Sequence, residues 1–112
     1  MGSTNNKVEY NFERSLEVIS HALDMGVSFC FSFDGTSMIP TILPNAKIKL
    51  FNTTSLELNN IYVYIDINSP TKRLVCHRLI AIADDLCYFK GDNRKEIDPP
   101  VAMEMVIAEV VL

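Results

Sequence analysis

The sequence predicts a mainly β protein: a compact, mostly antiparallel β-domain with one helix near its N-terminus. Residues 12–25 carry apolar side chains at spacings of three and four, which is typical of a helix. The rest of the chain holds short β-rich runs with turn signals between them. Because 112 residues can build one core but not two, we expect 12–112 to be a single domain after a flexible polar segment, 1–11.

A change in the spacing of apolar residues predicts the helix and the first strand. The apolar face of the predicted helix is formed by Phe12, Leu16, Ile19, Ala22 and Leu23. Gly26 follows as a C-terminal stop, because glycine accepts the left-handed backbone that ends many helices. Strict alternation then predicts a strand over 27–33, with one face formed by Val27, Phe29, Phe31 and Phe33.

The remaining predicted strands are 47–51, 61–66, 73–83, 86–90 and 105–112. Turn-forming residues separate them at 52–54, 68–70, 84–85, 91–93 and 99–100. The run 73–83 has apolar residues on both faces, so we expect a central strand that is buried on both sides.

Composition excludes several classes of function. Ten Lys and Arg against 14 Asp and Glu give a net charge of −4 without a basic block, which argues against nucleic acid as a partner. The three cysteines lack metal-ligand spacing, so we expect reduced thiols, no metal site and no cofactor. No apolar run approaches the length of a membrane span and no signal peptide is recognisable, so we expect a cytoplasmic protein or one peripheral to a membrane.

The stretch from Gly35 to Pro40 has an unusual pattern around Ser37. Gly35 can adopt a positive φ and Pro40 restricts Ile39, so we expect Ser37 on a stiff corner at a strand end. A serine nucleophile needs such a corner, where backbone N–H groups can also face an oxyanion. Taken alone, the same residues are more typical of an ordinary turn or helix cap.

A serine nucleophile also needs a base, and the chain has two histidines. His21 falls on the predicted helix, where we expect it to be partly exposed. His77 falls on the predicted central strand and points into or along the core. A histidine in that position is more often a hydrogen-bonded core residue than a catalyst.

Three segments together resemble the signal peptidase I family of serine endopeptidases. They are GTSMIPTI at 35–42, VCHRLI at 75–80, and KGDN at 90–93 with Asp98 after it. They occur in the family's order, and the span from Gly35 to Asp98 that contains them is more than half of the chain. The resemblance implies the β-fold that signal peptidases share with self-cleaving repressors.

The resemblance assigns roles by position. Ser37 falls on the family's nucleophile, and His77 falls on the base of the Ser-His branch, where many bacterial members have lysine. Asp98, seven positions after Gly91, falls on the third member. Asp92 is the runner-up for that role and is otherwise expected to brace its loop.

The same resemblance places the oxyanion and substrate-binding groups next to the nucleophile, at Gly35, Thr36 and Met38. Many relatives have a serine hydroxyl at the position of Gly35, so the second oxyanion donor is left unassigned.

The implied function is removal of a leader segment from a peptide or protein substrate by acyl transfer through Ser37 and His77. Family members are membrane-anchored, whereas this chain has only an amphipathic helix before the first box, so it looks like a minimal catalytic core. A membrane-associated partner and the oligomeric state are left open.

Two other interpretations are considered. One is a non-catalytic peptide-binding module with the same fold. The other is a relative of the self-cleaving repressors, which is disfavoured by the acidic charge, by His77 at the base position and by the lack of a DNA-binding domain.

Overall fold

The computed structural model describes residues 12–53, 55–68 and 70–112. In order, the elements are α1 (Phe12–Asp24), β1 (Phe29–Phe31), β2 (Ile48–Phe51), β3 (Ile61–Asp66), β4 (Arg73–Ala83), β5 (Leu86–Lys90), β6 (Val101–Ala102), the 3-10 helix η1 (Met103–Met105) and β7 (Val106–Val111). The mainly β architecture with one N-terminal helix is therefore confirmed. The segment 1–11, which we expected to be flexible, lies outside the described residues.

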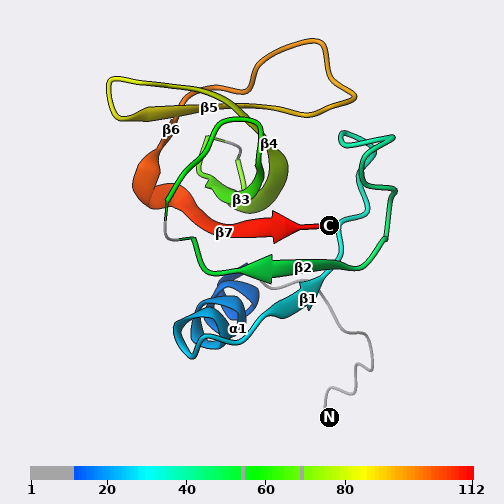
Figure 1. Ribbon diagram of the computed structural model, residues 1–112, viewed down its shortest axis with the longest axis vertical. Helices are drawn as coiled ribbons and strands as arrows, with labels where there is room; N and C mark the ends of the chain where they lie inside the picture. Colours follow the sequence, from blue (N-terminus) through cyan, green and yellow to red (C-terminus); the bar gives the residue numbers. More distant parts are fainter. Residues whose placement is uncertain (1–11, 54, 69) are drawn as a thin grey trace.

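The strands form one antiparallel sheet in the order β1-β2-β7-β3-β4-β5-β6. Figure 1 shows this sheet curling around itself, with α1 beside β1 and β2 at one end. The last strand, β7, lies between β2 and β3. It therefore joins the part of the sheet next to α1 to the part that contains β4.

The helix ends as its sequence predicts. Gly26 has a φ of +75°, its N–H donates to the Leu23 carbonyl at 2.9 Å, and the Val27 N–H donates to the Ala22 carbonyl at 3.0 Å. This pair of bonds is a Schellman motif, which satisfies carbonyls that the helix end leaves without partners. Ile19 and Leu23 are buried in the main hydrophobic cluster.

The first strand is shorter than predicted. We expected 27–33, whereas β1 covers Phe29–Phe31 and pairs with Ile48–Leu50 of β2. Val27 is 54% exposed because it belongs to the helix cap rather than to the strand. At the other end, the Phe33 carbonyl accepts a bond from the Asn45 N–H across a loop at 2.7 Å, instead of continuing the ladder.

The bounds predicted for β3, β4 and β5 match those observed. Asp84 and Asp85 connect β4 to β5 with φ values of 52° and 63°, as the tight turn of a two-residue hairpin requires. The two-residue strand β6 was not predicted, because it is too short to show a period.

Only the first half of β4 is buried on both faces, so the prediction for the whole strand is wrong. Leu74 and Cys76 point into one hydrophobic cluster, and Leu79 points into the other. After Arg78 the pairing with β3 ends, and a β-bulge lies between Leu79 and Ala81. Beyond that point β4 pairs with β5 and no longer with β3, and Ile82 is 38% exposed.

In the part of the chain that the structure describes, no helix is long and apolar enough to cross a bilayer. The β-fold type shared with signal peptidases stays a prediction.

Candidate active site

Ser37 and His77 are brought together by elements far apart in the sequence. Ser37 lies in the loop between β1 and β2, and His77 lies on the interior strand β4. The Ser37 hydroxyl is 2.9 Å from Nε2 of His77. His77 is 7% exposed, so its ring has little freedom to turn away from the hydroxyl.

Asp98 completes the arrangement on the other side of the imidazole. Its Oδ2 lies 2.5 Å from Nδ1 of His77, and its backbone N–H donates to the Phe89 carbonyl of β5 at 2.8 Å. Burial raises the pKa of Asp98, but hydrogen bonds to His77 and Tyr64 outweigh burial and lower that pKa overall. Asp98 is therefore ionised, and it fixes Nδ1 as the protonated nitrogen and Nε2 as the acceptor that faces Ser37.

Tyr64 on β3 is a member of the cluster that the sequence reasoning missed. Its hydroxyl donates to Oδ2 of Asp98 at 2.6 Å, and its ring stacks on Phe89 with centroids 4.7 Å apart. Burial, followed by the contact with Asp98, raises the pKa of Tyr64, so the hydroxyl stays protonated and remains a donor. A signal existed in the position of Tyr64 on the predicted strand 61–66, because a tyrosine that is buried in a sheet needs a partner for its hydroxyl.

Asp92 has the bracing role expected of it. Arg78 donates to both of its carboxylate oxygens, at 2.9 and 2.8 Å, and Thr41 donates to Oδ2 at 2.5 Å. The hydrogen bond from Arg78 is the largest of the effects that lower the pKa of Asp92, and the same contact raises the pKa of Arg78. Asp92 thus ties β4 to the loop that carries Ser37, with its carboxylate occupied by these partners.

The loop after β5 is docked directly on the nucleophile. The backbone N–H of Asn93 donates to the Ser37 carbonyl at 2.7 Å, and its side-chain amide donates to the Thr36 carbonyl at 3.1 Å. A Cβ at Gly91 would lie 2.7 Å from the Ser37 carbonyl oxygen and 3.1 Å from Nε2 of His77. Only glycine allows this approach, so the three sequence boxes meet at one point.

The expected geometry at Gly35 is wrong. Gly26 is the glycine with a positive φ in the described chain, and a Cβ at Gly35 would meet nothing within 4 Å. Ser37 also lies beyond the end of β1 at Phe31, rather than at a strand end. The corner is held instead by the contacts from Asn93 and by a turn in which the Ile39 N–H donates to the Thr36 carbonyl at 3.2 Å.

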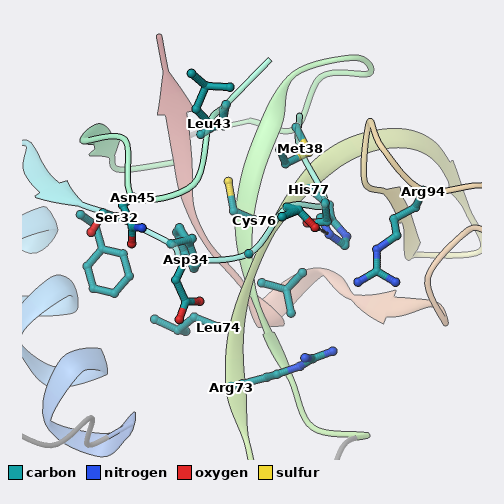
Figure 2. Close-up of a pocket in the computed structure, with 17 residues that line it drawn as sticks. Ser32, Asp34, Met38, Leu43, Asn45, Arg73, Leu74, Cys76, His77 and Arg94 are labelled. Carbon is teal, nitrogen blue, oxygen red and sulfur yellow. Dashed lines mark hydrogen bonds between the residues drawn. The ribbon is translucent and has the colours of Figure 1, made fainter. Parts of the chain in front are cut away.

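A cleft of about 530 Å³ opens beside Ser37 and His77. Figure 2 shows the labelled side chains around it, with Asp34 and Leu43 on one side of β4 and Arg94 on the other. Gly35, Thr36 and Met38, the predicted substrate-binding residues, all line this cleft. Within the described ranges, the Ser37 N–H has no hydrogen-bond acceptor, so it is available to an oxyanion.

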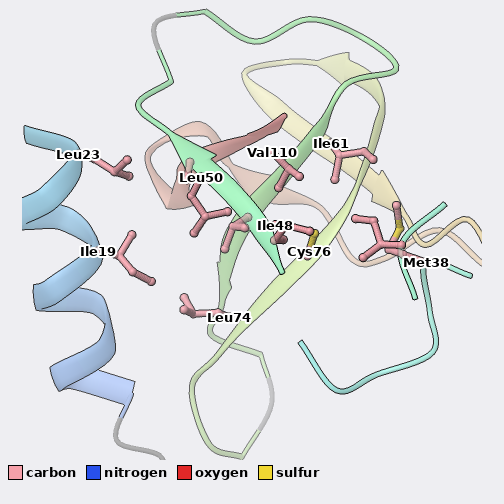
Figure 3. Close-up of a cluster of buried hydrophobic side chains, with 12 residues drawn as sticks. Ile19, Leu23, Met38, Ile48, Leu50, Ile61, Leu74, Cys76 and Val110 are labelled. Atoms are coloured by element: carbon pink, nitrogen blue, oxygen red, sulfur yellow. The ribbon is translucent and has the colours of Figure 1, made fainter. Parts of the chain in front are cut away.

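Met38 also anchors the nucleophile loop in the core. It is 5% exposed and belongs to the cluster that contains Ile19 and Cys76. Figure 3 shows this cluster running from Ile19 and Leu23 on α1 to Met38 at its far end. Burial raises the pKa of the Cys76 thiol to about 12, so Cys76 is a neutral core residue.

A second cleft, of about 350 Å³, lies on the Asp98 side of His77 and is lined by Tyr64, Pro99 and Pro100 among others. His21 is exposed on α1 and is not among the residues that line either cleft. Among the residues that the structure describes, no group of three or more His, Cys, Asp or Glu side chains is arranged to hold a metal ion.

The site by itself has the arrangement of a Ser-His-Asp triad, the kind used in acyl transfer. The chain matches no protein-family model, no curated protein and no solved structure in comparisons with known proteins. The case for a particular family therefore depends on the three sequence boxes and on this geometry.

Proposed function

We propose that this protein is a serine endopeptidase of the signal peptidase I type, in the Ser-His branch, which removes a leader segment from a peptide or protein. The observation that carries the proposal is the continuous chain of contacts from Ser37 Oγ through both nitrogens of His77 to Asp98. The three boxes that suggested the family are the ones that meet at this point.

In the proposed reaction, Nε2 of His77 takes the proton of Ser37 while Oγ attacks the carbonyl carbon of the scissile peptide. The tetrahedral intermediate collapses, the C–N bond breaks, and His77 returns the proton to the leaving amine. A water molecule then gives a proton to His77 and attacks the acyl ester. The bond between the acyl carbon and Oγ breaks, His77 returns the proton to Oγ, and the new carboxyl end is released. Throughout, Asp98 offsets the charge of the imidazolium.

Substrate binding would use the larger cleft. Its apolar lining beside Ser37 includes Ile42, Leu74 and Val75, which suits an extended peptide with small side chains. Such a peptide would bind as an added strand, through backbone hydrogen bonds. The proposed location is the cytoplasm or a membrane surface that is reached through a partner protein.

The test is covalent labelling of the purified protein with a phosphonylating, serine-directed probe, followed by mass analysis of the labelled peptide. We expect labelling at Ser37, none in Ser37→Ala, and strong slowing in His77→Ala. The control is Ser32→Ala, which changes another serine that lines the same cleft. Labelling that is unchanged in His77→Ala would contradict the proposal.

The same purified protein can be used to decide between an enzyme and a non-catalytic binding module. A module would bind extended peptides without cleaving them, and its affinity would be the same in Ser37→Ala. The enzyme should convert such peptides into two products, and Ser37→Ala should abolish the conversion.

A further inference from the structure

Arg94 occupies the point where the two clefts meet. Four residues line both clefts: Arg73, Val75, His77 and Arg94. The stem of Arg94 lies over Gly91, since a Cβ at Gly91 would be 2.9 Å from the Arg94 Cγ. Gly91 in turn adjoins the Ser37 carbonyl and the His77 ring. The exposed side chain of Arg94 therefore starts beside the bond that the site would break.

Arg94 makes no ion pair within the described residues. Arg73 pairs with Asp66 at 3.2 Å, and Arg78 pairs with Asp92 at 2.8 Å. By contrast, no carboxylate in the described ranges (12–53, 55–68 and 70–112) lies within ion-pair distance of the Arg94 guanidinium. Figure 2 shows this guanidinium extended beside His77, on the side of β4 away from Asp34.

We propose that Arg94 is a specificity-determining residue that binds a carboxylate of the substrate close to the scissile bond. The inference rests on the proposed function and gives it a substrate class: peptides with an acidic side chain, or a free C-terminus, within reach of the cut. A guanidinium offers paired N–H donors that match a carboxylate, and the walls of a cleft strengthen such a contact relative to open water.

A different role would be purely electrostatic. Arg94 adds a small lowering effect on the pKa of Asp98, so its removal could slow every substrate equally. If Arg94 binds a carboxylate of the substrate, its removal should slow the cleavage of acidic peptides more than that of their uncharged counterparts. The experiment measures this difference.

The experiment uses alanine-rich peptides that carry Asp at each position in turn, and a matched set that carries Asn. Each peptide is made with a free and with an amidated C-terminus. Cleavage is followed by mass spectrometry for the unchanged protein, for Arg94→Gln and for Lys95→Gln. Lys95 is the matched control, because it is exposed and carries the same charge as its neighbour Arg94 but lines neither cleft.

We expect kcat/KM for one Asp peptide to exceed that of its Asn counterpart by about fivefold, the upper end of what an exposed ion pair usually contributes. Arg94→Gln should abolish the preference, and Lys95→Gln should keep it. A preference that disappears on amidation identifies the C-terminal carboxylate as the group bound. Cleavage without any acid preference, or with a preference that survives in Arg94→Gln, overturns the inference and leaves the proposed function intact.

Failure of the proposed function gives a different pattern, in which no peptide is cleaved. Binding of the same peptides to Ser37→Ala, measured by fluorescence anisotropy, then decides about Arg94. Tighter binding of Asp peptides that is lost when Arg94→Gln is added supports carboxylate recognition in a protein without turnover. If Asp and Asn peptides bind equally well, the inference that Arg94 binds a carboxylate is overturned as well.

Discussion

Tyr64 and His77 share one acceptor, because the tyrosine hydroxyl and Nδ1 of the imidazole both lie against Oδ2 of Asp98, at 2.6 and 2.5 Å. The acid of the triad is thus held between β3, which carries Tyr64, and β4, which carries His77. Its backbone is held by β5 through the Phe89 carbonyl. The carboxylate has a fixed position before any substrate arrives, as an efficient triad requires.

Tyr64→Phe removes one donor to Asp98 and keeps the stacked ring. We expect the free energy of unfolding to fall by about 1.5–3 kcal/mol, the usual contribution of a hydrogen bond to a charged group. Labelling of Ser37 should slow as well, because the carboxylate is less firmly placed. Denaturant unfolding and labelling rates measure the two effects. Tyr88→Phe is the control, since Tyr88 lies on β5 and lines neither cleft; equal losses in both variants would contradict this role.

Asp98→Asn and Asp92→Asn separate the acid of the triad from the brace. Asp98→Asn should slow labelling of Ser37 by up to about 10⁴-fold, as loss of the orienting carboxylate does in other triads. Asp92→Asn breaks the double contact with Arg78 and should lower the unfolding free energy by about 1–2 kcal/mol, with a smaller effect on labelling. An Asp92→Asn protein that is stable but unreactive would reverse the two assignments.

Gly91→Ala and Gly35→Ala form a second matched pair. The new methyl group at position 91 would collide with the Ser37 carbonyl and press on His77, so we expect lost labelling and a destabilisation of about 1–3 kcal/mol. The methyl group at position 35 meets open space and an ordinary φ. Gly35→Ala should therefore be neutral or stabilise by up to about 1 kcal/mol. Thermal unfolding of both variants checks this, and similar losses at the two positions would refute it.

Acid should destabilise the fold through Asp92 and Asp98, whose pKa values are both lowered in the folded protein. The unfolded chain then binds more protons at low pH, so the stabilisation is complete above about pH 4, the ordinary value for Asp, and is lost as pH falls through the lower folded values. Denaturant midpoints from neutral pH downward measure this. The fall should be shallower in Asp92→Asn, and an identical pH dependence in that variant would exclude a contribution from Asp92.

The sequence predicted well what depends on local pattern. The helix and its Gly26 stop, the turn at Asp84 and Asp85, and the strands β3 to β5 follow from period and turn chemistry. Ser37, His77 and Asp98 were predicted because their residue types occur in a known order, and the structure brings them together.

The sequence-based predictions are wrong or incomplete where contacts between distant parts of the chain determine the structure. Val27 alternates with the strand, but the helix cap takes its N–H. Ile82 is apolar, but it lies beyond Arg78, where the pairing of β4 with β3 ends. The role of Tyr64 could be predicted only by knowing that β3 lies next to β4. The place of Arg94 could be predicted only by knowing where the two clefts meet. None of these pairings is visible in a single sequence without an assumed topology.

The place of β7 has a consequence for the order of folding. Ser37 lies in the loop between β1 and β2, whereas Tyr64 and His77 lie on β3 and β4. In the described sheet, β2 and β3 are joined by strand pairing only through β7. Because β7 comes after both pairs of strands along the chain, we expect the contact between Ser37 and His77 to become fixed late, once residues 106–111 have paired with both neighbours.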